Sequence, residues 1–296
     1  MLCAAFLLLA VGGLMIGAAA VKGNFDIVNR KGLSDEMKTF EVTEAFTDIR
    51  VEDTEGNVCI LQAPDGKCRV ICPEKPDGSI YYTVTVRGGE LSVQRHDNRK
   101  WYQHIGVSFG PQDVEVYLPE KAYGQLTACS TSGSIRVDEG FTFENARLES
   151  TSGSVRMFSA VKKVLTAEST SGRVTIENAS PETLSAYSSS GRIMLSHIRS
   201  AEISARSTSG KIELTDVIAE KTLYARSTSG GVALEDCDGG AIRLESTSGS
   251  VKGTLLSDKI FITDSTSGSV NIPRSSAGGE CEITTTSGSI EIRIRP

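Results

Sequence analysis

A short polar segment, Ser-Thr-Ser-Gly or a close variant, occurs nine times between residue 130 and the end of this 296-residue chain. The glycines of successive copies are 19 or 20 residues apart, at Gly133, Gly153, Gly172, Gly191, Gly210, Gly230, Gly249, Gly268 and Gly288. Flexible linkers are also rich in serine and glycine, but a disordered segment has no reason to keep a constant spacing. A fixed period of this length is typical of repeat architectures, in which each unit buries its apolar face only against its neighbours.

Apolar residues alternate with polar residues on both sides of each repeat glycine. The positions seven and five residues before the glycine are mostly apolar, and so are those two and four residues after it. The position two residues after it is always β-branched: Ile135, Val155, Val174, Ile193, Ile212, Val232, Val251, Val270 and Ile290. Alternation with a period of two indicates a β-strand with one buried face. Each repeat therefore predicts one strand on either side of the corner segment, followed by a return segment of variable sequence.

The corner segment has a structural explanation. The inward phase shifts across the glycine, so we expect the chain to turn there, with glycine at positive φ and the hydroxyl groups satisfying nearby backbone groups. The serine three residues before each glycine is expected to point inward and form a ladder that begins at Ser130. Stacking of the units at about 4.8 Å predicts an all-β fold. It is a single-chain β-solenoid, or β-helix, with coils of 19–20 residues.

The repeat continues toward the N-terminus in a degenerate form. The segment IRVEDTEGNVCI, residues 49–60, follows the pattern, with Gly56 in the place of the repeat glycine. A weaker coil is expected in VTVRGGELSV, residues 84–93. We predict one continuous solenoid over residues 40–296, with irregular early coils in 40–125 and regular repeats in 126–296.

The N-terminal segment is different, because residues 2–21 contain no charged side chain. About 20 helical residues at roughly 1.5 Å each span the hydrocarbon core of a bilayer. We therefore predict one transmembrane helix over residues 1–22, a single-pass anchor in the cell membrane, and a linker over residues 23–39. A cleavable signal stays open as an alternative, because the alanines at 18–20 resemble a cleavage site. The basic residues that follow would by themselves favour keeping the rest of the chain inside the cell.

Two sets of residues are candidates for ligand binding. Residues 95–110, RHDNRKWYQHIGVSFG, fit no repeat and contain the only tryptophan. Trp101 and Tyr102 could form a platform for a sugar ring, and a packing flap over the stack is the structural alternative. The outward position four residues before the repeat glycine carries the second set, Glu149, Glu168, Arg206 and Arg226.

This outward column stacks like charges one coil apart. Glu149 lies beside Glu168, and Glu245 beside Asp264, so either pair could seat a cation. The alternative is a solvated face that arginines partly compensate, with each exposed pair contributing little to stability.

The sequence contains no hydrolase elbow, metalloprotease motif or phosphate-binding loop, and no Cys or His cluster with zinc spacing. We therefore expect no enzyme, with no catalytic residue, metal or cofactor. A net charge of −6 argues against nucleic acid as a partner. The rival class is a polysaccharide lyase or hydrolase built on a β-helix, for which only the outward charged column would be available.

The chain ends on a strand pattern, SIEIRIRP, with no capping element after it. We expect the last coil to present an unpaired edge, which Arg293, Arg295 and Pro296 protect against pairing with another chain. Docking of a protein partner on this end is the alternative.

Several segments together carry a resemblance to a known family. They are the apolar N-terminal segment, FEVTEAFTDIRVEDTEGNVCI, RKWYQHIGV, the [ST]-[ST]-S-G-x-[IV] coils and LLSDKIFITDSTSGSVNIP. They resemble bacterial envelope proteins described as "putative adhesins", a domain-of-unknown-function family with β-helical repeats. The resemblance covers nearly the whole chain and implies a membrane-tethered solenoid outside the cell that binds a glycan, cell-wall or protein ligand.

The resemblance also leaves a second function open. Some relatives are associated with envelope-stress responses, so it implies an envelope-stress sensor or antimicrobial-peptide binder as the alternative to an adhesin. It supplies no catalytic residue, and a shared fold does not determine a function.

Overall fold

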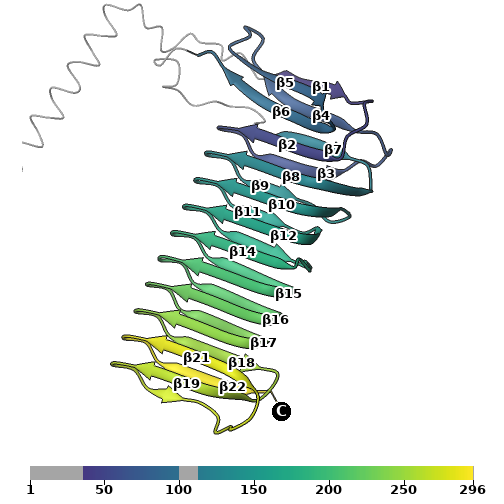
Figure 1. Ribbon diagram of the computed structural model, residues 1–296. Coiled ribbons are helices and arrows are strands. Elements are labelled where there is room, and N and C mark those ends of the chain that lie inside the picture. Colours follow the sequence, from purple (N-terminus) through teal and green to yellow (C-terminus); the bar gives the residue numbers. More distant parts are fainter. Residues whose placement is uncertain (1–35, 100–112, 296) are drawn as a thin grey trace, which may run out of the picture.

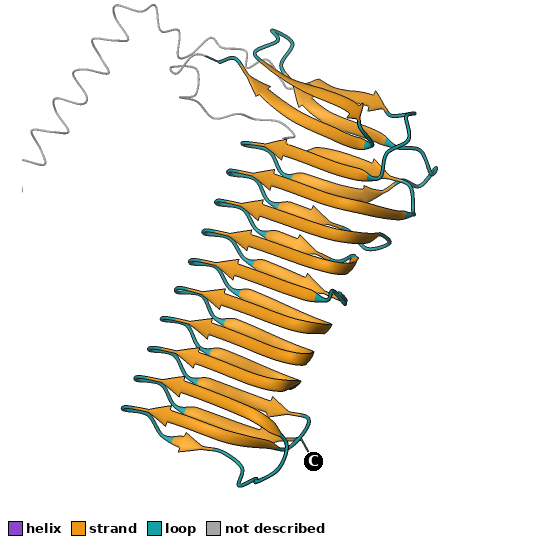
Figure 2. Cartoon of the chain, viewed as in Figure 1, coloured by secondary structure: helices purple, strands orange, loops and turns teal. Residues whose placement is uncertain are grey.

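The computed structural model describes residues 36–99 and 113–295, and every regular element in them is a β-strand (Figure 2). The strands stack into one elongated rack (Figure 1). This confirms the predicted all-β solenoid with coils of 19 or 20 residues. The described part of the chain has no helix of the length and apolarity needed to cross a bilayer, and the anchor predicted at residues 1–22 lies outside that part.

Two faces of the stack meet at the glycine corners. The leading face holds the strands that precede the corners: β6 (Glu90–Asp97), β2 (Asp48–Asp53), β8 (Ala122–Ser130), β10 (Thr142–Ser150), β12 (Ala160–Ser169) and β14 (Thr183–Ser188). The trailing face holds those that follow them: β7 (Val114–Leu118), β3 (Val58–Gln62), β9 (Ile135–Val137), β11 (Val155–Met157) and β13 (Val174–Glu177). Further along, the return segments are also extended. The long strands β15 (Ile193–Ser207), β16 (Ile212–Ser227) and β17 (Val232–Ser246) therefore run from the trailing face of one coil to the leading face of the next.

The apolar columns form the core between these faces. Val155 pairs in parallel with Ile135 on one side and with Val174 on the other, so one β-branched column runs along the trailing face. These side chains, and Leu165 on the leading face, are fully buried. Burial of one such side chain contributes about 1.5–3 kcal/mol. The stack therefore gains most when an apolar residue of one coil lies on an apolar residue of the next.

The repeat serines form the predicted inward ladder. The Ser188 hydroxyl is buried; it donates to the Gly172 carbonyl of the neighbouring coil at 3.0 Å and accepts from the Gly191 N–H of its own coil at 2.9 Å. The same two bonds are made by Ser130, Ser150, Ser169, Ser227, Ser246, Ser265 and Thr285. At these corners one hydroxyl thus satisfies two buried or part-buried backbone groups, whereas Ser207 only accepts from the Gly210 N–H.

The repeat glycines are needed for a different reason than predicted. None of the nine adopts positive φ, so that prediction is wrong. Adjacent corners approach closely instead: a Cβ on Gly191 would lie 1.9 Å from the Gly172 carbonyl oxygen. Any larger residue would force the corners apart. Positive φ occurs at a second corner, six residues after the glycine, at Asn178, His197, Asp216 and Asp236, which are residue types that tolerate this region better than most.

The first coil does not lie at the end of the stack. Strand β2 pairs with β6 on one side and β8 on the other, and β3 lies between β7 and β9. The coil made of β2 and β3 is therefore inserted between the second and third coils of the sequence.

Antiparallel strands close the N-terminal end beyond β6 and β7. Strand β5 (Ile80–Arg87) pairs with β6, β4 (Arg69–Glu74) pairs with β7, and β1 (Glu36–Glu41) pairs with β4. The predicted coil at residues 84–93 is a hairpin, because Val84 and Val93 are partners across β5 and β6. Only its second strand joins the parallel stack.

The C-terminal end repeats the insertion. Strand β21 (Gly279–Thr285) lies between β17 and β19 (Lys259–Ser265), and β22 (Ile290–Ile294) lies between β18 (Val251–Leu255) and β20 (Val270–Asn271). The prediction that the last strand is an unpaired edge is therefore wrong, because β22 has neighbours on both sides. The edge belongs to the preceding coil, in which Ile260, Ile262 and Val270 are exposed.

Candidate functional site

Four of the six residues that the sequence puts forward for ligand binding lie on the leading face. Glu149, Glu168, Arg206 and Arg226 occupy outward positions of β10, β12, β15 and β16, between buried neighbours. Parallel pairing places them in one column, with Tyr187 between the two glutamates and the two arginines. Trp101 and Tyr102 lie outside the described residues.

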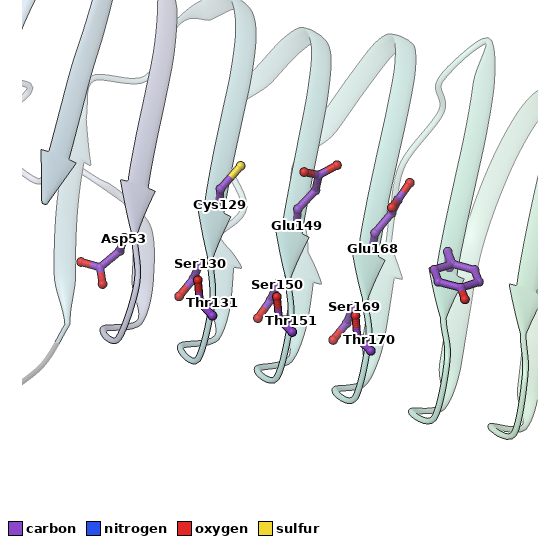
Figure 3. Close-up of a pocket in the computed structure, with 11 residues that line it drawn as sticks. Asp53, Cys129, Ser130, Thr131, Glu149, Ser150, Thr151, Glu168, Ser169 and Thr170 are labelled. Atoms are coloured by element: carbon purple, nitrogen blue, oxygen red, sulfur yellow. The ribbon is translucent and has the colours of Figure 1, made fainter. Parts of the chain in front are cut away.

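The glutamates line a shallow groove with a volume of about 360 Å³ next to the first repeat corners. Figure 3 shows Cys129, Glu149 and Glu168 side by side on adjacent strands, with corner residues such as Thr151 and Thr170 beside them. The groove is open along the stack. It therefore suits a ligand that lies on the surface better than one that is enclosed.

Glu149 and Glu168 form a local negative patch. They are register partners in β10 and β12, so their backbones are about 4.8 Å apart. Arg147 makes an ion pair with Glu149, whereas Glu168 has no ion pair with any residue of the described chain. Like charges directly opposite each other are unfavourable. The patch therefore favours a cationic group of a ligand.

Two other groups of the groove are poorly suited to catalysis. Burial, and then the neighbouring Glu149, raise the pKa of the Cys129 thiol, so this thiol is protonated and a weak nucleophile at neutral pH. Asp53 is buried, and its carboxylate accepts hydrogen bonds from the Gly56 N–H at 2.7 Å and the Tyr82 hydroxyl at 2.5 Å. In the first coil Asp53 occupies the position of the repeat serine, and its carboxylate is engaged in these structural hydrogen bonds.

The charge of the column reverses beyond Tyr187. Arg206 and Arg226 are register partners, and the Arg206 guanidinium lies 5.1 Å from the centre of the Tyr224 ring. Tyr187, on the other side of Arg206, is 37% exposed. Arg226 makes an ion pair of 3.5 Å with Glu245, whereas Arg206 has no carboxylate partner within the described part of the chain. Arg206 and its two tyrosine neighbours form what we call the tyrosine–arginine patch, a surface that can contact a sugar ring or an anionic group.

The second predicted pair of like charges does not form. Because β21 is inserted, Glu245 is the register partner of Thr284, and Thr284 is the partner of Asp264. Glu245 and Asp264 are therefore two coils apart, and Glu245 pairs with Arg243 at 2.6 Å instead. In residues 36–99 and 113–295, no group of three or more His, Cys, Asp or Glu side chains is placed to hold a metal ion.

Sequence reasoning missed the two tyrosines of the patch. Tyr187 and Tyr224 stand four and six residues before a repeat glycine, at outward positions where the other coils have small or charged residues, apart from Ile262. An aromatic residue at an outward position of a regular repeat was the available signal. The two tyrosines could be recognised as a cluster only once the order of the coils was known.

Comparisons with known proteins give one family and several solved structures. A model of the family described as Toastrack DUF4097 matches residues 46–235 and 162–296. A "putative adhesin" from Bacteroides fragilis has a similar structure, with 15% identity, 88% of this chain and 99% of that chain covered, and a TM-score of 0.45. A "putative lipid binding protein" from Parabacteroides distasonis has 14% identity, with 87% of this chain and 97% of that chain covered and a TM-score of 0.40. No curated protein matches the chain.

Proposed function

We propose that this chain, which belongs to the Toastrack DUF4097 family, is a non-enzymatic surface protein that binds a ligand through the leading face of its solenoid. In this proposal, residues 1–22 hold the chain in the cell membrane as a single transmembrane helix, and the solenoid lies outside the cell. The observation that carries the proposal is the tyrosine–arginine patch, in which Arg206, which has no carboxylate partner among the described residues, lies between Tyr187 and Tyr224. Tyrosine and arginine are the residues that most often dominate binding surfaces.

The shape of the leading face favours a polymeric ligand. The sheet from β8 to β17 is continuous, and its outward side chains recur once per coil, in steps of about 4.8 Å. A tyrosine ring offers an apolar surface to a sugar ring and a hydroxyl for hydrogen bonding. A glycan or a fragment of cell wall lying along the face would use both properties. The chain would then act as an adhesin.

Binding of the full chain, in a neutral detergent, to neutral glycans and cell-wall fragments tests this function. We expect saturable binding without release of product, and Arg206→Ala should weaken it at least about fivefold, the loss of roughly 1 kcal/mol typical of a contact that matters. Arg293→Ala is the matched control, because Arg293 has 72% side-chain exposure and lies on β22. Equal binding by the two variants would contradict the patch, and release of product would contradict a non-enzymatic role.

The acidic groove supports a second function, an envelope-stress sensor that binds cationic antimicrobial peptides. Glu149 and Glu168 provide the negative potential that such a peptide requires. The double variant Glu149→Gln/Glu168→Gln should weaken binding of a cationic peptide and leave glycan binding unchanged. The control removes the same charge elsewhere, by Glu202→Gln/Glu220→Gln. If the double variant binds the cationic peptide as tightly as the unmodified chain does, this function is excluded.

A further inference from the structure

A line of cations runs along the trailing face, away from the groove and the tyrosine–arginine patch. Five consecutive coils each carry one cation, at the outward position one or three residues after the repeat glycine. The five residues are Arg136, Arg156, Arg173, Arg192 and Lys211, which we call the cationic ladder. All five are exposed. Arg136 and Arg156 lie within β9 and β11 between buried residues, and the other three directly precede the buried first residues of β13, β15 and β16.

The cations of the ladder outnumber the carboxylates beside them. Arg136 pairs with Asp138 at 2.5 Å, and Arg192 and Lys211 share Glu213 at 3.3 and 2.9 Å. The other two arginines have no carboxylate partner in the part of the chain that the structure describes. Two carboxylates therefore pair with three of the five cations, in a protein whose formal net charge is −6.

The repeat does not require these cations. The coil after Lys211 has Gly231 and Ala233 at these two positions and keeps the same fold. Like charges on neighbouring strands repel each other, which lowers stability. A charge arrangement that costs stability and that the architecture does not need points to a ligand that neutralises it.

We propose that the cationic ladder binds a linear acidic polysaccharide, a chain of sugars that carry carboxylates, along the axis of the stack. This inference rests on the proposed function as a ligand-binding surface protein. It names a class of ligand for the trailing face, whereas the proposed function uses the leading face. Guanidinium groups bind carboxylates through two parallel hydrogen bonds. The coils repeat about every 4.8 Å, which is close to the length of one sugar ring in an extended chain, so each cation can meet a carboxylate of a successive sugar.

The geometry favours a single polymer chain over other polyanions. The ladder extends over roughly 20 Å, four steps of strand spacing, but it is only one or two side chains wide. Its neighbours include the half-buried Met194 and the buried Thr175. A bilayer surface or a nucleic-acid duplex would need a broad positive face, which a ladder of this width does not offer.

Polygalacturonate, which has one carboxylate on each sugar, is the probe. Its fully methyl-esterified form has the same chain without charge and is the matched ligand control. We expect the full chain, kept in a neutral detergent, to bind only the charged form. The triple variant Arg156→Gln/Arg173→Gln/Arg192→Gln should bind it at least about tenfold more weakly. The slope of log K against the logarithm of the salt concentration should become shallower by up to about three.

A second triple variant, Lys162→Gln/Lys221→Gln/Arg293→Gln, removes the same charge from exposed positions outside the ladder and should bind like the unmodified chain. If both variants lose the same affinity for polygalacturonate, the inference is overturned, because binding would then depend on the net charge of the protein and not on the ladder. Binding of phosphatidylglycerol vesicles through the ladder, with no binding of polygalacturonate, would overturn it in favour of a membrane surface. Binding of neutral glycans alone would overturn it and leave the proposed function in place.

Discussion

At eight of the nine regular corners a single hydroxyl holds two backbone groups of adjacent coils, so its removal should be costly. In Ser188→Ala, the part-buried Gly172 carbonyl and Gly191 N–H both lose their side-chain partner, the buried Ser188 hydroxyl. We expect the free energy of unfolding to fall by about 2 kcal/mol or more, since each buried polar group without a partner costs about 1–3 kcal/mol. Urea titration followed by circular dichroism measures this. Ser190→Ala, at an exposed corner position, should change stability by less than about 0.5 kcal/mol, and similar losses in both would refute the role of the ladder.

The buried cysteines are expected to be inert thiols. Burial raises the pKa of Cys68 and of Cys237 from the ordinary value of 9.0 to about 11. Because only the thiolate reacts, a rise of two units lowers the reactive fraction at pH 8 by about a hundredfold. Labelling with iodoacetamide, followed peptide by peptide with mass spectrometry, should be at least that much slower in the folded chain than in urea, and should speed up as the pH rises toward 11. Fast labelling at pH 8 would show accessible, activated thiols and reopen a catalytic role.

Among the elements, β19 is the one most exposed to pairing with another chain. It pairs only with β21 within the described residues, and its outward Ile260 and Ile262 are 47% and 52% exposed. The segment from 260 to 263 contains no charge and no proline, the usual protections of an edge strand. We expect the full chain to self-associate as its concentration rises, and Ile262→Lys to reduce the average mass measured by sedimentation equilibrium. Val164→Lys should have no such effect, because Val164 is 45% exposed on β12, which has strand neighbours on both sides. A lower average mass in both variants would indicate non-specific hydrophobic association.

For the whole molecule, the inserted coil at the C-terminal end leads to a testable prediction. A stack built in chain order would lose only its last coil if residues 279–296 were deleted. In the observed order, β19 and β20 depend on β21 and β22 for their pairing. We therefore expect the deletion to release residues 259–272 as well, with hydrogen exchange as fast as in an unfolded segment. Ending the chain after residue 257 should leave the remaining coils protected, and continued protection of 259–272 in the first deletion would favour stacking in chain order.

The contrast between the middle of the stack and its ends explains what the sequence could predict. Each repeat carries its own register signal: Ser207 must lie under Ser227, and Ile212 under Val232, so the columns follow from spacing alone. The same signal cannot order the coils, because Phe261 and Cys281 occupy the same column and either could lie next to Ile242. Residues outside the columns have to make that choice, and the columns do not predict contacts such as the ion pair of 2.5 Å between the buried Lys259 and the part-exposed Asp238. The clustering of Arg206 with Tyr224 was predictable only once adjacent coils were known.

The inserted first coil also determines how the molecule responds to pulling. Tension applied through the first 35 residues enters the described fold at residue 36 and first peels β1, whose one strand partner among the described residues is β4. It then reaches β2, which is clamped between β6 and β8 and cannot detach one hydrogen bond at a time from an open edge. Further extension has to draw β2 out from between two partners, so the strand acts as a mechanical stop. A solenoid wound in simple chain order would unravel coil by coil from the end under load.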